Sequence, residues 1–122
     1  MAAYTSEGFG AYVQGDARVD VMEQLDFENA PAIQELAGDS FFVPVSEEQL
    51  TLLDAPLTVA FPIFVEASEI ISNPLWQTIP SVQQGHAVVL DDDTPANAFS
   101  SGSALGIQYA LENAVPLFAD AL

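Results

Sequence analysis

The sequence predicts one α/β domain, a three-layer α/β/α sandwich with a mostly parallel sheet of about four or five strands. Half of the 122 residues are hydrophobic, which is enough for a substantial buried core. Short apolar segments alternate along the chain with segments of helical periodicity, and strands that are apolar on both faces need helices on both sides of their sheet. There is no internal repeat and no linker, so we expect residues 1–122 to form a single domain.

The first part of the chain opens on an apolar segment. Ala2 to Ser6 is predicted to be a strand, followed by a loop from Glu7 to Gly15 that holds three of the seven glycines. Asp16 is a suitable N-cap for a helix that continues to about Phe27, since apolar residues recur there at intervals of three and four. Apolar residues follow Met1 at once, with no turn or cap, so we expect this chain to be part of a longer protein.

The middle of the chain contains two further predicted strands. A helix from Ala30 to Ala37 leads to the apolar strand Phe41 to Val45. Ser46 followed by Gln49 is a capping-box pattern for a helix that ends at about Leu53. The next apolar segment, Leu57 to Phe61, is predicted to be a strand that Pro62 ends.

The last part of the chain is mainly helical. Helices are predicted at Val65 to Ser72 and at Pro74 to Pro80, before a strand from Ala87 to Leu90. A polar loop then leads to a final helix from Ser103 to Leu122, which Pro116 is expected to kink or restart. The residues of this helix that we expect to face the core are Leu105, Leu111, Val115, Phe118 and Leu122.

The charge excludes several classes of partner. Against 18 acidic residues the chain has one basic residue, Arg18, which gives a formal net charge of −17. Nucleic-acid binding depends on Lys and Arg that neutralise phosphates, so we expect none. An anionic membrane surface would repel the chain for the same reason.

The residues alone indicate no catalytic site, no cofactor and no metal site. The chain has no cysteine, and its one histidine, His86, follows the turn at Gly85 and is expected to be a surface residue at the start of a strand. Asp91 to Asp93 offers oxygen ligands for calcium or magnesium, but the spacing does not match an EF-hand loop and a solvated acidic turn fits better. Trp76 is expected to belong to the core or to form a lid over it.

Several segments, taken in order, resemble the C-terminal lobe of the substrate-binding proteins that serve ABC importers of iron–siderophore complexes, haem and cobalamin. The resemblance covers nearly the whole chain. It is carried by Val45-Ser46-Glu47-Glu48-Gln49-Leu50, Leu53-Asp54, Asn73-Pro74-Leu75-Trp76 and Ile79-Pro80-Ser81-Val82-Gln83-Gln84-Gly85-His86. The chain departs from the family at His86, where arginine is usual, at a position that looks structural.

In that family two α/β lobes are joined by a long helix, and the ligand lies in the cleft between them. The resemblance implies that this chain is the C-terminal lobe of such a binding protein, without the N-terminal lobe, the connecting helix or a signal peptide. The implied ligand is an iron–siderophore complex, haem or a corrinoid, and the implied partner is an ABC permease. The parent protein would be extracytoplasmic, either periplasmic or a cell-surface lipoprotein.

The family's cleft-lining groups come from loops after the C-terminal ends of strands. Carried over by position, the ligand-binding residues are Phe9, Tyr12, Phe64 and Phe99. Each of these aromatic residues also suits a place in the core. The family often places arginines in these loops for anionic chelates, whereas this chain has only Arg18, so such a chelate would need positive charge from the missing lobe.

The resemblance also assigns a permease contact to Glu48, which stands in the family's Val-Ser-x-Glu-x-Leu pattern. The alternative is a structural role, because a carboxylate in the first turn of a helix is stabilised by about 0.3–1 kcal/mol. Apolar surface left open by the missing lobe predicts self-association as well.

Two other functions remain open at this stage. One is a small flavodoxin-like or hydrolase-like enzyme domain, because such enzymes share the three-layer sandwich. The other is a free-standing acidic interaction domain, in which the charge attracts a basic partner or reflects a high-salt source.

Overall fold

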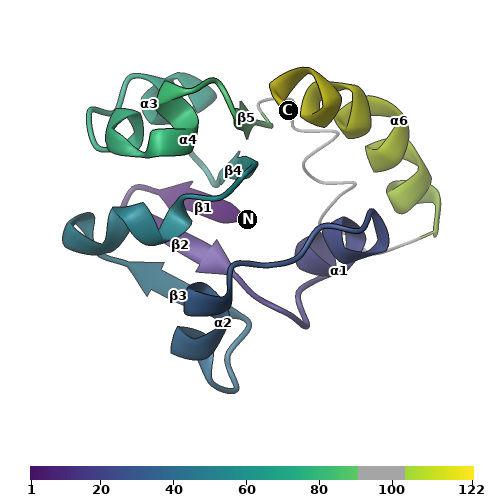
Figure 1. The fold of residues 1–122 in the computed structure, drawn as a ribbon, viewed down its shortest axis with the longest axis horizontal. Helices are drawn as coiled ribbons and strands as arrows, with labels where there is room; N and C mark the ends of the chain where they lie inside the picture. Colours follow the sequence, from purple (N-terminus) through teal and green to yellow (C-terminus); the bar gives the residue numbers. More distant parts are fainter. Residues whose placement is uncertain (91–103) are drawn as a thin grey trace.

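The computed structural model describes residues 1–90 and 104–122, which form one five-stranded sheet with helices on both faces (Figure 1). The elements are β1 (Ala2–Thr5), β2 (Gly8–Tyr12), α1 (Ala17–Gln24), α2 (Pro31–Ala37), β3 (Phe42–Val45), the 3₁₀ helix η1 (Glu47–Leu53), β4 (Thr58–Pro62), α3 (Ala67–Ile71), the 3₁₀ helix η2 (Trp76–Thr78), α4 (Pro80–Gln83), β5 (Ala87–Val89) and α6 (Ala104–Ala121).

The strand order in the sheet is β3-β2-β1-β4-β5. β1 pairs with β4 in parallel and β4 pairs with β5 in parallel, whereas β2 is antiparallel to both of its neighbours. Four strands therefore run in one direction and β2 runs in the other. The predicted α/β sandwich with a mostly parallel sheet is confirmed.

The prediction of a loop from Glu7 to Gly15 is wrong, because Gly8–Tyr12 form the strand β2. The two-residue turn Ser6-Glu7 joins β1 to β2 in a hairpin, and Gly8, at φ 121°, accommodates its geometry. Gly10, which favoured a loop in the sequence, lies beneath the ring of Phe42, and a Cβ at this position would overlap that ring. Glycine is thus a packing residue in this strand, because a position without a side chain leaves room for the far end of the Phe42 ring.

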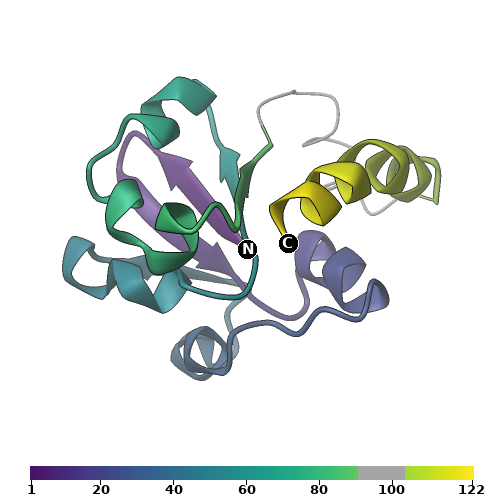
Figure 2. The same cartoon turned by 45° about the horizontal axis from the view of Figure 1, so that its top comes forward.

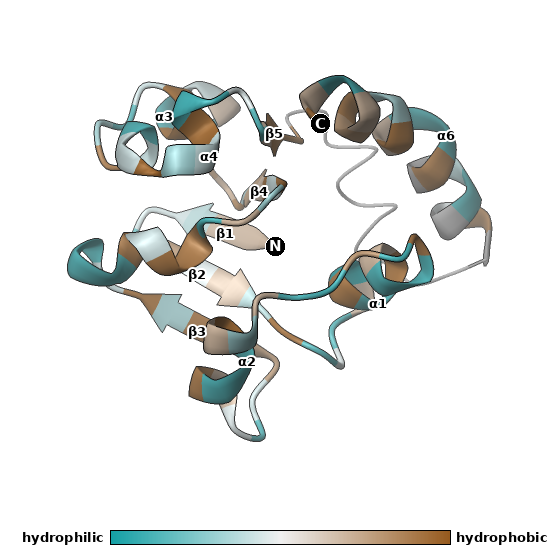
Figure 3. Ribbon diagram, in the orientation of Figure 1, coloured by the Kyte–Doolittle hydropathy of each residue, from teal (hydrophilic) through white to brown (hydrophobic). Residues whose placement is uncertain are grey.

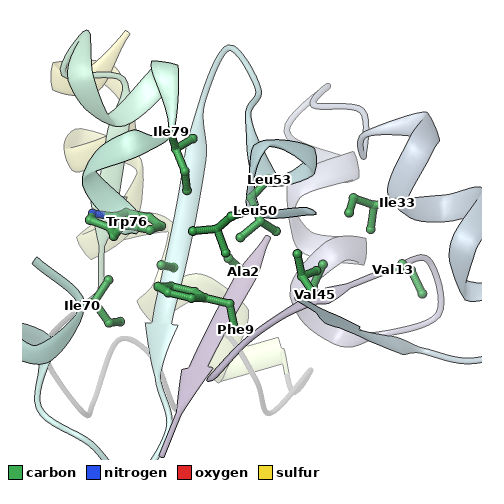
Figure 4. Close-up of a cluster of buried hydrophobic side chains, with 12 residues drawn as sticks. Ala2, Phe9, Val13, Ile33, Val45, Leu50, Leu53, Ile70, Trp76 and Ile79 are labelled. Carbon is green, nitrogen blue, oxygen red and sulfur yellow. The ribbon is translucent and has the colours of Figure 1, made fainter. Parts of the chain in front are cut away.

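Two hydrophobic clusters separate the layers. On one face the strands pack against α2, η1, α3, η2 and α4, around Phe9, Leu50, Ile70, Trp76 and Ile79 (Figure 4). On the other face α1 and α6 cover the sheet, as Figures 1 and 2 both show. Trp76 is buried as predicted.

The parallel half of the sheet forms from residues that are apolar on both faces. In β4, Ala60 belongs to the first cluster, while Val59 and Phe61 belong to the second. A strand buried on both sides needs such a continuous apolar sequence, which is why this strand was predictable. β3, in contrast, is an edge strand of four residues, and Pro44, which has no N–H group, limits further pairing at that edge.

Buried hydroxyl groups fix α4 against β4. Thr58 Oγ1 donates to the carbonyl oxygen of Leu53 at 3.0 Å and lies 2.7 Å from Ser81 Oγ, so the Ser81 hydroxyl donates to Thr58. The Ser81 amide in turn donates to Asp54 Oδ1 at 2.8 Å. All three polar side chains are therefore satisfied where the sequence segments Leu53-Asp54 and Ser81-Val82 meet.

Several predicted helices are shorter or different in kind. Asp16 caps α1 by accepting from the Arg18 amide at 2.9 Å, as predicted, but α1 ends at Gln24 because Asp26 adopts a positive φ of 66°. The predicted capping box at Ser46 does not form, because the Ser46 side chain accepts no hydrogen bond from a backbone amide of the helix. Instead Ser46 Oγ donates to Gln49 Oε1 at 3.2 Å, and the segment is a 3₁₀ helix.

The final helix α6 is continuous through Pro116 and buries Ala114 and Phe118. The prediction that Leu105 and Leu122 face the core is wrong, since 82% and 60% of their surfaces are exposed. The N-terminal turns of α6 lie beyond the sheet (Figure 1), so the strands do not cover the apolar side of these turns. Figure 3 shows the mixture of hydrophobic and hydrophilic residues along α1 and α6.

None of the helices in residues 1–90 and 104–122 is both long and apolar enough to cross a membrane.

Candidate functional site

A groove lies at the edge of the sheet where β1 and β3 end and β2 begins. Its volume is about 300 Å³. This edge holds the carboxyl ends of the parallel strands, where open α/β sheets bind ligands. The residues that line the groove are Tyr4, Ser6, Glu7, Gly8, Phe9, Val45, Ser46, Glu47, Leu50, Asn73 and Leu75.

Aromatic rings form the floor of this groove. The ring centroids of Tyr4 and Phe9 lie 4.6 Å apart, and Phe9 stacks on Trp76 with centroids 6.0 Å apart and planes 8° from parallel. Phe9 is 8% exposed, so the structure places this predicted ligand contact largely in the core. Little of the Phe9 side chain is therefore available to a ligand, and the partly exposed Tyr4 offers more surface.

The Tyr4 hydroxyl group is positioned by a loop that is distant in sequence. Asn73 Nδ2 donates to Tyr4 Oη at 3.4 Å, and Asn73 Oδ1 accepts from the Leu75 amide at 2.9 Å. The second bond closes an Asx turn that holds the Asn73 side chain in place. Residues of the Asn73-Pro74-Leu75-Trp76 segment thus build one side of the groove and part of the core below it.

Phe64 follows β4 at the same edge of the sheet. The Ile63 amide donates to the carbonyl oxygen of Tyr4 at 2.9 Å, so the chain leaves β4 beside the end of β1. Phe64 has a φ of 56°, a conformation that is strained for a bulky residue, and its side chain is fully exposed, at 105% of the reference value. A strained backbone beneath a fully exposed aromatic side chain is more typical of functional sites than of cores.

The structure places Tyr12 away from the groove. It lies at the opposite end of β2, where its amide donates to the carbonyl oxygen of Met1 at 3.0 Å. The guanidinium carbon of Arg18 lies 4.1 Å from the centroid of its ring, and Arg18 Nη1 is 2.9 Å from Asp16 Oδ2. Burial raises the pKa of Tyr12, an effect that Arg18 opposes and Asp16 reinforces. Tyr12 and Phe9 therefore do not share one surface.

Two predicted site residues remain, Glu48 and Phe99. Glu48 is exposed in the first turn of η1, directly after the groove residues Ser46 and Glu47. Phe99 lies outside the described residues.

The groove is acidic and has no basic side chain in its lining. Glu7 and Glu47 line it from the hairpin turn and from the start of η1. Arg18, the one Lys or Arg of the sequence, is engaged by Asp16 instead, and His86 lines a separate hollow beside Asp54 and Ser81. Within residues 1–90 and 104–122, no group of three or more His, Cys, Asp or Glu side chains is arranged to hold a metal ion.

Sequence reasoning missed Tyr4, Glu7 and Asn73 as groove residues. The signal was the short polar break Ser6-Glu7 between two apolar segments, which is typical of a hairpin turn at the end of a strand. Asn73 had no local signal, because its partner Tyr4 is 69 positions away.

Comparison with known proteins identifies one solved structure with this fold. PiaA of Streptococcus pneumoniae TIGR4, in complex with ferrichrome, matches this chain with a TM-score of 0.79 and 22% identity. The match covers 98% of this chain and 41% of PiaA. No protein-family model matches the sequence, and no curated protein is significantly similar to it. At this identity the match establishes the fold, and this chain spans about two-fifths of the length of PiaA.

Proposed function

We propose that this chain is the C-terminal lobe of an ABC importer's substrate-binding protein. The end of the sheet that holds the groove, here called the groove edge, would form one wall of a cleft for an iron–siderophore-like ligand. The observation that carries the proposal is the fold match to PiaA in complex with ferrichrome, over 98% of this chain. The segments that resemble this family in sequence provide independent support.

The position of the groove agrees with this function. It lies at the carboxyl ends of β1 and β3, beside the end of β4. This is the end of the sheet at which the family resemblance implies the ligand contacts of the C-terminal lobe. Tyr4 and Phe9 line the groove, whereas Phe64 is not among its lining residues but is fully exposed after β4 at the same end of the sheet. These three rings offer aromatic surface for an organic chelate or a flat macrocycle. We retain Phe64 as the principal ligand contact, and Phe99 stays a proposed contact from sequence position alone.

The share of PiaA that is matched, 41%, agrees with one lobe of a two-lobed protein. In the complete protein, the other wall of the cleft would come from an N-terminal lobe, and the protein would act outside the cytoplasm as a carrier rather than an enzyme. Glu48 would contact a basic pocket of the permease, since it is exposed next to the groove edge.

One wall binds a ligand only weakly. High affinity requires burial of most of the ligand surface, and binding free energy is the surplus left after ordering costs. We therefore expect the 122-residue chain to bind such ligands more weakly than about 1 µM.

Titration of the purified chain tests the proposal. Gallium(III) ferrichrome, which does not quench fluorescence as iron does, is followed by Trp76 emission, because Trp76 stacks on the groove-floor residue Phe9. Haem and cobalamin are followed by their own absorption. We expect weak saturable binding of one ligand class, whereas no binding of any ligand would refute the proposed function and tight one-to-one binding would refute the single-wall account.

Two matched variants locate the site. Phe64→Ala removes an exposed aromatic side chain at the groove edge, and Phe41→Ala removes one that is 61% exposed and packs on Gly15 near the opposite edge. We expect Phe64→Ala to weaken binding several-fold. The affinity of Phe41→Ala should equal that of the unmodified chain.

A further inference from the structure

The charged groups around the groove indicate which chelates it accepts. Glu7 and Glu47 line the groove from two elements, and the full chain carries a formal net charge of −17. Both carboxylates are exposed and neither makes an ion pair within the described residues. A ligand in the groove therefore meets negative potential from its nearest neighbours and from the chain as a whole.

No basic side chain of this chain offsets that potential. Arg18 is the only Lys or Arg in the sequence, and its guanidinium lies over the Tyr12 ring at the opposite end of β2. Two contacts from Arg18 Nη1 to the Asp16 carboxylate, at 3.0 and 2.9 Å, engage it further. The charge of Arg18 is thus neutralised locally, and the groove has no counterion for an anionic ligand.

We infer that the groove selects ferric chelates by charge, with cationic complexes preferred over neutral ones and neutral ones preferred over anionic ones. This inference rests on the proposed function and narrows its ligand class. A tris-hydroxamate complex of iron(III) is neutral at the metal, so a free ammonium on such a chelator gives a net positive charge that Glu7 and Glu47 attract. A catecholate or carboxylate complex with net negative charge would be repelled by the same two residues.

A series of ligands that differ only in charge tests the inference. The gallium(III) complex of desferrioxamine B carries one positive charge on its terminal ammonium. Acetylation of that amine gives a neutral complex, and succinylation gives a complex with one negative charge. The metal centre and the chelating backbone are the same in all three, so differences in affinity for the 122-residue chain report on charge.

We expect affinity to fall from the cationic to the neutral to the anionic complex, with a difference of about tenfold between the extremes at low salt. The difference should shrink as ionic strength rises, because exposed charges are screened. Equal affinities, or the reverse order, would overturn the inference. Absence of binding by all three and by gallium ferrichrome would instead refute the proposed function.

Two substitutions assign the effect to the groove. Glu7→Gln and Glu47→Gln should each reduce the ratio of cationic to anionic affinity by about threefold, since each removes one neighbouring charge while preserving side-chain shape. Glu35→Gln, at an exposed position on α2 that does not line the groove, is the matched control for the change in net charge. If Glu35→Gln lowers the ratio as much as the groove variants do, the selectivity comes from the overall charge and the assignment to Glu7 and Glu47 is wrong.

Discussion

Replacement of Phe64 by glycine should stabilise the fold and weaken ligand binding at once. The residue has a positive φ of 56° and a fully exposed side chain, so it contributes strain and no burial. The left-handed conformation costs a non-glycine residue about 1–2 kcal/mol. Glycine adopts it freely but loses about 0.5–1 kcal/mol through the greater freedom of the unfolded chain. The expected net change is a gain of about 0.5–1 kcal/mol in the free energy of unfolding.

Urea unfolding of the two proteins measures this change. The midpoint should rise without a change in the m-value, since the surface exposed on unfolding is almost the same. Phe41→Gly is the matched control, because Phe41 is also an exposed aromatic residue but is not among the described residues with positive φ. That variant relieves no strain and loses the contact with Gly15, so its stability should fall. If Phe64→Gly lowers the midpoint as Phe41→Gly does, Phe64 is a structural residue and our reasoning about strain at a binding edge is wrong.

Three further predictions follow from the fold and the sequence. Burial lowers the pKa of the Met1 amino group from 8.0 to about 6, so the unfolded chain binds this proton more readily. Stability should therefore rise by roughly 2 kcal/mol from pH 6 to pH 8, as measured by urea unfolding, and acetylation of the amino group should abolish this rise. Gly10→Ala should lower the free energy of unfolding by about 1–2 kcal/mol, because its Cβ overlaps the ring of Phe42. The same substitution should cost much less in a Phe42→Ala background, and an equal cost in both backgrounds would show that the ring does not require glycine here. Glu48→Lys in the full-length protein should reduce uptake through the permease and leave ligand affinity unchanged, and normal uptake at normal protein levels would return Glu48 to a purely structural role.

The sequence predicts β4, in the parallel half of the sheet, well because this strand is buried on both faces. Val59, Ala60 and Phe61 belong to clusters on opposite sides of β4, so the whole segment is apolar and its pattern is unambiguous. β2 is not predictable from its own sequence, because its glycines are typical of a loop. The reason for Gly10 in this strand is the ring of Phe42, which comes from a strand 32 positions later.

Helix packing was predictable only where the sheet extends under the helix. Phe118 packs against the sheet as its periodicity predicts, whereas Leu105 is exposed, and the N-terminal turns of α6 lie beyond the sheet (Figure 1). The periodicity of a helix shows which side is apolar, and it does not show how far the neighbouring layer reaches.

The sequence indicates the end of the sheet at which a ligand site would lie, and which residues contact a ligand stays a prediction. The loop after β4 was assigned from the general placement of ligands at the carboxyl ends of strands, and Phe64 lies there exposed. Tyr12 was grouped with Phe9 because both were expected in one loop, but as strand residues three positions apart they face opposite sides of the sheet. Asn73 was not predictable as a groove residue, since its contact with Tyr4 depends on the folded chain.

The central claim is that the groove edge is a ligand-binding wall, and mapping by NMR tests it most directly. Amide resonances of the ¹⁵N-labelled chain are recorded during titration with gallium(III) ferrichrome, which is diamagnetic and preserves the spectrum. We expect shifts at the hairpin turn Ser6 to Gly8, at Val45 to Glu47 and at Phe64, with none at Arg18 or at His86 in the separate hollow. Shifts that cluster around His86 or Arg18, or that are absent throughout, would contradict the account.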